Sequence, residues 1–159
     1  KILKLFLIAC LFTLTAQAQK KYELASPNGK LKTNITAGKQ LTCDIVFGDQ
    51  QVIAAAPISR TWENGEVWGE NDKPTSAKRK SVNTKVASPF YRATEMEDNY
   101  NQLVLSFRGN WSVEFRAYND GIAYRFVNKS KKPFNIANEE VNLQFNSDAM
   151  GTVPFVIRG

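Results

Sequence analysis

The sequence contains no histidine among its 159 residues. This absence excludes the Ser-His-Asp and Cys-His arrangements, in which an imidazole activates the nucleophile. It also removes the commonest ligand of catalytic zinc sites. Acid–base chemistry near neutral pH is therefore left to the carboxylates.

Cysteine is nearly absent: the chain has Cys10 and Cys43 alone. Cys10 lies in an N-terminal segment that we expect to be removed, so the mature chain cannot form an internal disulfide. Its stability must then come from a hydrophobic core. Cys43 lies in the alternating run Leu41–Ile45, a pattern that predicts a small buried apolar residue and not a nucleophile.

A long apolar run occurs only at the start of the chain. Lys1 and Lys4 precede the apolar segment Leu5–Thr15, and Ala16-Gln17-Ala18 supplies small residues at a cleavage site. This pattern predicts a signal peptide over residues 1–18, cleaved after Ala18. The apolar segment is shorter than the roughly twenty residues that span a membrane. We therefore expect export to the periplasm or the medium, with no membrane span.

Lipid anchoring is the alternative fate of this segment. Leu7-Ile8-Ala9-Cys10 resembles a lipoprotein cleavage box, in which Cys10 would carry the lipid. Few apolar residues precede Cys10 and the apolar run continues beyond it, so the pattern favours soluble export.

The chain is positively charged, but the distribution of its basic residues does not indicate a nucleic-acid partner. The formal net charge is +6, and two clusters stand out, Lys78-Arg79-Lys80 and Lys129–Lys132. Both lie in polar, turn-like stretches without a recognised binding motif, so we interpret them as solvated loops.

The first half of the mature chain predicts short strands separated by turns. Turn signals at Ser26–Gly29, Ala37–Gln40 and Gly48–Gln51 divide the alternating segments. Strands at such spacing indicate an antiparallel meander. The predicted strands are Tyr22–Ala25, Lys30–Thr36, Leu41–Phe47 and Val52–Ala55.

The alternation fades between Pro57 and Ser88. Trp62–Glu70 is aromatic and interrupted by glycines, and Asn71–Lys85 is polar and contains a proline. We expect Asn71–Lys85 to be a long loop, and long loops in compact domains are often functional.

Strand patterns return in the second half. Asn101–Arg108, Trp111–Tyr118 and Ile122–Val127 alternate, and Asn119-Asp120-Gly121 predicts a tight hairpin between the last two. Two further runs cover Phe134–Ile136 and Val141–Phe145. No segment has a long helical pattern, so the sequence predicts an all-β, antiparallel β-sandwich.

The C-terminal residues suggest an incomplete domain. The chain stops at Phe155–Gly159, within an apolar, strand-like run that has no polar tail. We therefore expect residues 19–159 to form only part of a β-sandwich domain.

The acidic residues offer no clear catalytic pair. Asp120 has the position of a turn residue, Glu95 and Glu97 lie in a polar approach to a strand, and Glu139-Glu140 precede another strand. Solvation or turn geometry accounts for each of them. The full set of candidates is Glu63, Glu66, Glu70, Glu95, Glu97, Asp98, Asp120, Glu139 and Glu140.

The segment Trp62–Glu70 is the best candidate for contact with a sugar. Aromatic rings stack on the apolar faces of pyranose rings, and carboxylates accept hydrogen bonds from hydroxyls. We therefore predict substrate contacts for Trp62, Glu66 and Trp68. The alternative is that both indoles anchor the segment on the core; Trp111, which alternates within a strand, is expected to be a core residue.

One stretch resembles a known family. The stretch Glu114-Phe115-Arg116-Ala117-Tyr118-Asn119-Asp120-Gly121-Ile122-Ala123-Tyr124-Arg125-Phe126 is similar to a signature hairpin of glycoside hydrolase family 97. Ser26–Leu31 resembles the opening hairpin of that family, and Asp98–Leu103 resembles its approach to a later strand. Gln102 stands where the family pattern often has Glu; we interpret it as a strand-edge position.

The resemblance implies a fold and an activity for a longer protein. It implies a galactose-mutarotase-like β-supersandwich, here incomplete at its C-terminus, followed by a (β/α)8 barrel and a small β domain. It also implies hydrolysis of α-glucosidic or α-galactosidic bonds in oligosaccharides, with calcium at the active site. The barrel would carry the catalytic carboxylates, so no catalytic or metal-binding residue is assigned here, and this part alone would be inactive.

A second reading remains open from the residues alone. A free-standing β-sandwich that binds a glycan or a partner protein would fit the same strand pattern. The sequence downstream of Gly159 distinguishes the two readings.

Overall fold

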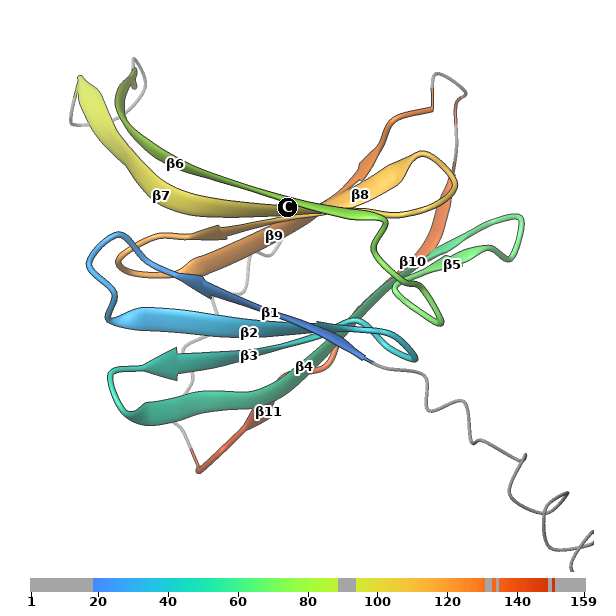
Figure 1. Ribbon diagram of the computed structural model, residues 1–159, viewed down its shortest axis with the longest axis horizontal. Helices are drawn as coiled ribbons and strands as arrows, with labels where there is room; N and C mark the ends of the chain where they lie inside the picture. The colour runs from blue at the N-terminus through green and yellow to red at the C-terminus, as the bar shows by residue number, and fades with distance from the viewer. Residues whose placement is uncertain (1–18, 89–93, 131–132, 134, 149, 151–159) are drawn as a thin grey trace, which may run out of the picture.

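The protein is a two-layered antiparallel β-sandwich (Figure 1). The computed structural model describes residues 19–88, 94–130, 133, 135–148 and 150. This part contains strands and turns without a helix, and so has no helix that could cross a membrane. The all-β prediction is confirmed, whereas the predicted signal peptide and the C-terminal run Phe155–Gly159 lie outside the described residues.

The first sheet is built on one long strand. Its order is β1-β2-β3-β4-β10, and β5 and β11 also pair with β4. All of these pairings are antiparallel. The strands are β1 Lys20–Ala25, β2 Leu31–Ala37, β3 Thr42–Phe47, β4 Gln50–Trp62, β5 Val67–Trp68, β10 Ile136–Val141 and β11 Gln144–Phe145.

The second sheet is a four-stranded meander in the order β6-β7-β8-β9. Its strands are β6 Ser76–Ala87, β7 Glu95–Ser106, β8 Trp111–Ala117 and β9 Ile122–Asn128. The predicted hairpin is confirmed: β8 and β9 pair from Trp111↔Asn128 to Ala117↔Ile122 across Asn119-Asp120-Gly121.

The core lies between the two sheets. Alternate residues of β8, namely Trp111, Val113, Phe115 and Ala117, are all buried. They face apolar residues of the first sheet such as Ile35. The Cys43 thiol is buried here too, as predicted, and burial together with the neighbouring Asp44 charge raises its pKa to about 11. The buried area supplies the main stabilisation of a fold without disulfides.

The turns that resemble the family signature meet in space. The backbone N–H of Asn28, in the β1–β2 turn, donates a hydrogen bond of 3.0 Å to Oδ1 of Asn119, in the β8–β9 turn. Asn28 Oδ1 also accepts from the backbone N–H of Lys30 at 3.0 Å. The two sequence segments are thus parts of one contact between the sheets.

The prediction of a loop over Asn71–Lys85 is wrong for most of its length. β6 occupies Ser76–Ala87 and pairs with β7 along its whole length. All but one of its residues are exposed, because β6 is an outer strand with solvent on both faces. Burial therefore imposes no alternation on its sequence, and hydrogen bonds to β7 hold it as a strand.

The other differences concern strand ends. β4 continues through Pro57 and is therefore longer than the predicted strand Val52–Ala55. Pro57 is the last residue to pair with β3, and pairing with β10 begins at Ile58, so the missing N–H costs little there. The sequence predicted that Glu95, Glu97, Glu139 and Glu140 precede strands. Instead, Glu95 and Glu97 lie within β7, and Glu139 and Glu140 lie within β10.

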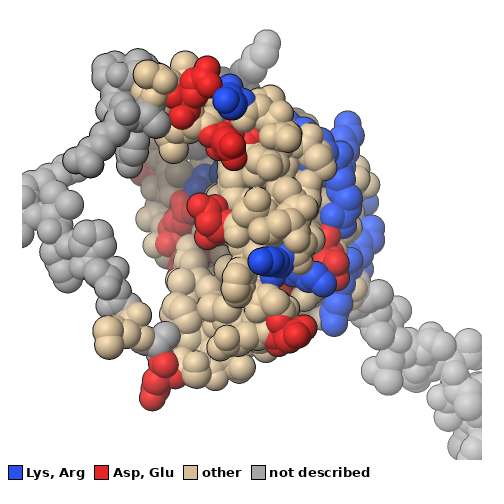
Figure 2. Space-filling model, turned by 90° about the vertical axis from the view of Figure 1, so that its left-hand side faces the viewer, with Lys and Arg blue, Asp and Glu red and all other residues tan. Residues whose placement is uncertain are grey.

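Basic side chains gather on one side of the sandwich. Lys78, Arg79 and Lys80 lie on β6, which corrects their assignment to a loop, and Lys20 and Lys21 lie on β1. Figure 2 shows lysines and arginines along its right-hand side. This side is the face turned toward the viewer in Figure 1, where β1 and β6 lie. The second cluster, Lys129–Lys132, falls partly outside the described residues.

Candidate functional site

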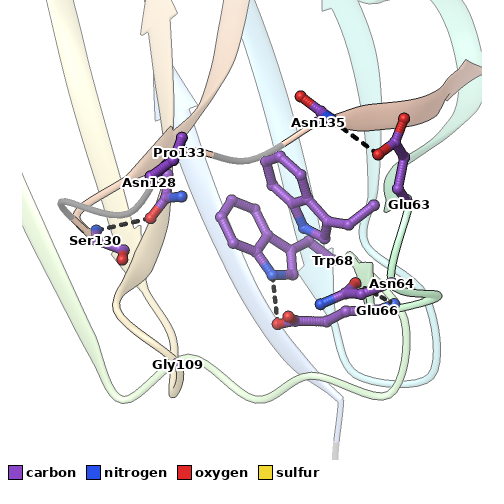
Figure 3. A pocket seen from close by; sticks show the side chains of 10 residues that line it. Glu63, Asn64, Glu66, Trp68, Gly109, Asn128, Ser130, Pro133 and Asn135 are labelled. Atoms are coloured by element: carbon purple, nitrogen blue, oxygen red, sulfur yellow. Dashed lines mark hydrogen bonds between the residues drawn. The ribbon is translucent and has the colours of Figure 1, made fainter.

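A hollow of about 540 Å³ opens at one end of the sandwich, where the ends of β4, β5 and β9 meet the β7–β8 turn (Figure 3). The turn between β4 and β5 forms one wall, and the residues that follow β9 form the other. Its lining residues are Trp62, Glu63, Asn64, Glu66, Trp68, Gly109, Asn128, Ser130, Pro133 and Asn135.

Local hydrogen bonds fix the β4–β5 turn. The N–H of Gly65 donates to the carbonyl of Trp62, and the N–H of Trp62 donates to the carbonyl of Glu66, both at 2.9 Å. Oδ1 of Asn64 accepts from the N–H of Glu66 at 3.0 Å. Gly65 has a φ of 84°, a conformation that glycine adopts without steric cost. The side chains of this wall are therefore held on a short, well-determined turn.

Two indoles form the floor of the hollow. Both Trp62 and Trp68 are buried. The Trp68 ring stacks on Trp111, with centroids 4.8 Å apart and planes 5° apart. Trp62 meets Trp68 edge-on at 4.4 Å. Aromatic contacts of this kind add to the energy of burial, so the turn is anchored on the core through its aromatic side chains.

Gly69 lets β5 lie close to β4. Its φ is 97°, and a Cβ built there would lie 2.6 Å from the carbonyl oxygen of Ile58. Its own carbonyl accepts from the N–H of Leu41 at 2.7 Å, and its N–H donates to Oδ2 of Asp72 at 3.3 Å. Burial and the nearby Glu66 charge raise the pKa of Asp72, against the lowering effect of the Gly69 N–H.

Polar groups form the rim. Nε1 of Trp68 donates to Oε1 of Glu66 at 2.8 Å, and Nδ2 of Asn135 donates to Oε2 of Glu63 at 2.8 Å. Figure 3 shows these carboxylates and amides around the two indoles. Carboxylate and amide groups beside an aromatic floor can accept and donate hydrogen bonds to the hydroxyls of a bound sugar.

The structure brings the three predicted contact residues together. Trp62, Glu66 and Trp68 all line the hollow. The burial of both indoles matches the alternative in which they anchor the segment, and their contact with a substrate stays a prediction.

Sequence reasoning missed the opposite wall, which includes Asn128, Ser130 and Asn135. These residues lie more than sixty positions from the turn, and only strand pairing brings them to it. The polar segment after β9 was visible in the sequence, but nothing in it indicated this neighbour.

A second charged cluster lies between β4, β9 and β10. Nη2 of Arg60 pairs with Oε2 of Glu139 at 2.5 Å, and the guanidinium lies 5.0 Å from the ring centroid of Phe126. Burial, together with the Glu139 charge, raises the pKa of the nearby Tyr124 hydroxyl to about 12. The cluster holds β9 over the first sheet.

The described residues offer no ready metal site. No three histidine, cysteine, aspartate or glutamate side chains come together among them. The calcium implied by the family resemblance therefore has no identified ligands in the described part of the chain.

Comparison with known protein families shows to which family the chain belongs. The family model for the N-terminal region of glycosyl hydrolase 97 matches residues 24–154. The chain belongs to glycoside hydrolase family 97. A retaining alpha-galactosidase of Bacteroides thetaiotaomicron is 54% identical over 155 residues. That match covers 97% of this chain but 23% of the relative, so the chain spans about a quarter of the length of that relative.

Solved structures show the same fold at lower identity. A family 97 enzyme from Pseudoalteromonas sp. strain K8, in complex with panose, superposes with a TM-score of 0.68 at 22% identity. The superposition covers 79% of this chain and 20% of that one. A beta-arabinopyranosidase gives a TM-score of 0.70 at 13% identity, over 79% and 21% of the two chains. At these identities the likenesses show the fold alone, and they agree with the β-sandwich described above.

Proposed function

We propose that this chain is the N-terminal β-sandwich domain of an exported glycoside hydrolase that cleaves α-galactosidic bonds in oligosaccharides. The observation that carries the proposal is the 54% identity to a retaining alpha-galactosidase over nearly the whole chain. Hydrolysis of α-glucosidic bonds is the alternative specificity, because the sequence resemblance to the family covers both.

The bond-cleaving groups are proposed to lie in a (β/α)8 barrel on which this domain packs. Glycoside hydrolysis needs two carboxylates that flank the scissile bond, and retaining enzymes hold them roughly 5 Å apart. Barrel enzymes build such pairs from the loops at the C-terminal ends of their strands. The sandwich would wall one side of the pocket, and we assign no calcium ligand among the residues described.

Comparing the long and the short protein tests this division. The full coding sequence and residues 19–159 are expressed separately and assayed with nitrophenyl α-galactoside and α-glucoside. We expect hydrolysis by the full-length protein, fastest with the galactoside, and none by residues 19–159. Turnover by residues 19–159 would refute the proposal, and so would a coding sequence that ends near Gly159, which would favour a stand-alone binding module.

The hollow at the β4–β5 turn is proposed to contact the sugar. Glu66 presents a carboxylate at the rim, and Glu66→Gln removes its charge while keeping an oxygen that accepts from the Trp68 indole. In the full-length enzyme we expect KM to rise roughly tenfold with little change in kcat, since a hydrogen bond to a charged group is lost.

Glu140→Gln is the matched control, because Glu140 is an exposed acid on β10 outside this hollow. It should leave KM unchanged. Equal KM values for the two variants and the wild type would show that the hollow does not contact the substrate.

A further inference from the structure

A second hollow, of about 530 Å³, lies beside the one that the tryptophans floor. It opens between the start of β1, the connection from β5 to β6 and the turn from β7 to β8. Arg108 lines this second hollow, and its neighbour in the chain, Gly109, lines the first. The two hollows therefore share the β7–β8 turn and lie at the same end of the sandwich.

Three basic residues line the second hollow. Lys20 comes from β1, Lys73 from the β5–β6 connection and Arg108 from the β7–β8 turn. None of them forms an ion pair within the part of the chain that the structure describes. Like charges gathered around a concave surface reinforce one another's field and raise the local concentration of anions. The second hollow therefore favours a negatively charged ligand.

One acid, Asp72, is present in the same lining. Its Oδ2 accepts a hydrogen bond of 3.3 Å from the N–H of Gly69. Burial raises the pKa of Asp72, against the lowering effect of that hydrogen bond. Three basic residues against one carboxyl group leave the lining with an excess of positive charge even when Asp72 is ionised.

Hydrogen bonds hold the walls of the second hollow in place. The N–H and Oγ1 of Thr75 both donate to the carbonyl of Ser106, at 2.7 and 3.0 Å, and so tie the β5–β6 connection to the end of β7. Nζ of Lys20 donates to the carbonyl of Pro74 at 3.3 Å, which keeps this ammonium group on the wall. Walls that are already fixed reduce the cost of ordering a site when a ligand binds.

The first hollow indicates what the rest of the ligand is. Its indole floor and its rim of carboxylates and amides suit the ring and hydroxyls of an uncharged sugar. The β5–β6 connection leads from one hollow to the other, since Trp68 lines the first and Asn71 the second. A ligand that fills both hollows would carry an uncharged sugar at one end and an anion at the other.

We propose that the second hollow binds the anionic substituent, a carboxylate or a sulfate ester, of an acidic oligosaccharide whose uncharged sugar lies in the first hollow. Arginine and lysine form charge-assisted hydrogen bonds with such groups, and the guanidinium can donate two at once. This inference rests on the proposed function, because it takes the first hollow to contact sugar. It adds acidic oligosaccharides as the class of ligand.

Isothermal titration calorimetry on the full-length protein tests the class of ligand. The probes are three α-linked galactose trisaccharides, joined through sulfur so that hydrolysis does not interfere. The reducing-end ring is unmodified in the first, carries a carboxylate at C6 in the second and carries a sulfate ester at C6 in the third. We expect one or both acidic probes to bind roughly tenfold more tightly than the neutral one. The tighter of the two identifies the anion, and equal affinities for all three overturn the proposal.

Salt gives a second measurement on the same probes. The preference for the acidic trisaccharide should shrink as sodium chloride is raised from about 0.05 to about 0.5 M, because salt screens exposed charges. A preference that salt leaves unchanged would contradict recognition by the basic residues.

Arg108→Gln and Lys73→Gln each remove one charge from the second hollow. Each should weaken binding of the acidic trisaccharide roughly fivefold, while binding of the neutral one stays unchanged. Lys78→Gln is the matched control, because it removes one charge from β6, outside both hollows. It should leave both affinities unchanged. Equal losses from all three variants would show that net charge alone acts, and would overturn the proposal.

Hydrolysis of nitrophenyl α-galactoside by the same preparation separates this inference from the proposed function. Activity without any preference for the acidic trisaccharides refutes the inference alone. A preference that depends on Arg108, in a protein that hydrolyses no α-glycoside, refutes the proposed activity and leaves the second hollow as a site for acidic oligosaccharides.

Discussion

At the scale of single residues, Gly69 is the described glycine with the least room for a side chain. Its φ is positive, and an added methyl group would lie 2.6 Å from the Ile58 carbonyl oxygen. We expect Gly69→Ala to lower the free energy of unfolding by roughly 2–4 kcal/mol, through backbone strain and displacement of β4. Guanidinium denaturation of the purified protein would measure it as a lower midpoint.

Gly65→Ala separates the two causes. Gly65 also has a positive φ, of 84°, but a Cβ there meets no atom within 4 Å. Its substitution should cost only about 1 kcal/mol. If both variants lose the same stability, the close approach to β4 contributes nothing.

Cys43 should make the stability of the domain depend on pH in the alkaline range. Its pKa is raised from 9.0 to about 11, mainly because burial disfavours the thiolate. Below pH 9 the thiol is protonated in both states and has no effect on the pH dependence. Between about pH 9 and 11 the unfolded chain loses the proton first, so stability should fall by ~2 kcal/mol as pH rises. Denaturation midpoints at pH 8 and 11 measure the loss.

Cys43→Ala is the comparison, because it removes the titrating group while keeping a small side chain. This variant should lose less stability between the two pH values than the wild type. In addition, native protein at pH 8 should react with a thiol reagent far more slowly than unfolded protein. Rapid labelling of the native state would contradict the burial of Cys43.

At the scale of elements, the signature residues of β8 hold the outer face of the second sheet. The Arg116 guanidinium lies 4.4 Å from the ring centroid of Tyr100 on β7, and Nη1 of Arg116 donates to the hydroxyl of Tyr118 at 3.3 Å. Lysine cannot reproduce a planar group that stacks and donates at once. Arg116→Lys should therefore cost ~1 kcal/mol of unfolding free energy, measured by chemical denaturation.

Arg125→Lys is the control on the next strand. Arg125 is more exposed and makes an ion pair with Glu114, and such surface pairs contribute roughly 0–1 kcal/mol. A lysine can keep this pair, so the variant should lose less stability than Arg116→Lys. The opposite order would mean that stacking on Tyr100 is unimportant.

Strands were predictable where burial acts on one face only. β8 alternates between buried inward residues and polar outward ones, and the sequence predicted its start, its end to within one residue, and its hairpin partner. β6 is exposed on both faces, so its residues carry no alternation and the sequence suggested a loop. Its strand structure depends on the neighbouring β7, which a local pattern cannot represent.

The candidate site divides in the same way. Trp62, Glu66 and Trp68 were predictable as a group because they are close in the chain and share a turn. Asn128 and Asn135 reach the hollow only because β9 and β10 are brought beside β4. Long-range pairing of this kind leaves no trace in the spacing of polar residues.

At the scale of the whole molecule, export should determine the N-terminus of the mature protein. We expect cleavage after Ala18, which leaves Gln19 at the start. Production from the native leader in a Gram-negative host, followed by mass spectrometry of the periplasmic protein, would measure the mature N-terminus.

A variant in which Ala18 is replaced by arginine serves as the control and should remain uncleaved, because the cleavage site needs small residues. A mature protein that begins at Cys10 and carries lipid would instead establish the anchored alternative.

The clustering of the tryptophans determines what an optical experiment on this domain can report. All three tryptophans of the chain belong to one cluster, with the ring centroid of Trp68 4.4 Å from that of Trp62 and 4.8 Å from that of Trp111. Intrinsic tryptophan emission therefore originates from a single location between the sheets. A spectral shift in this chain signals loosening at that junction, and fraying of the distant strand ends would pass undetected.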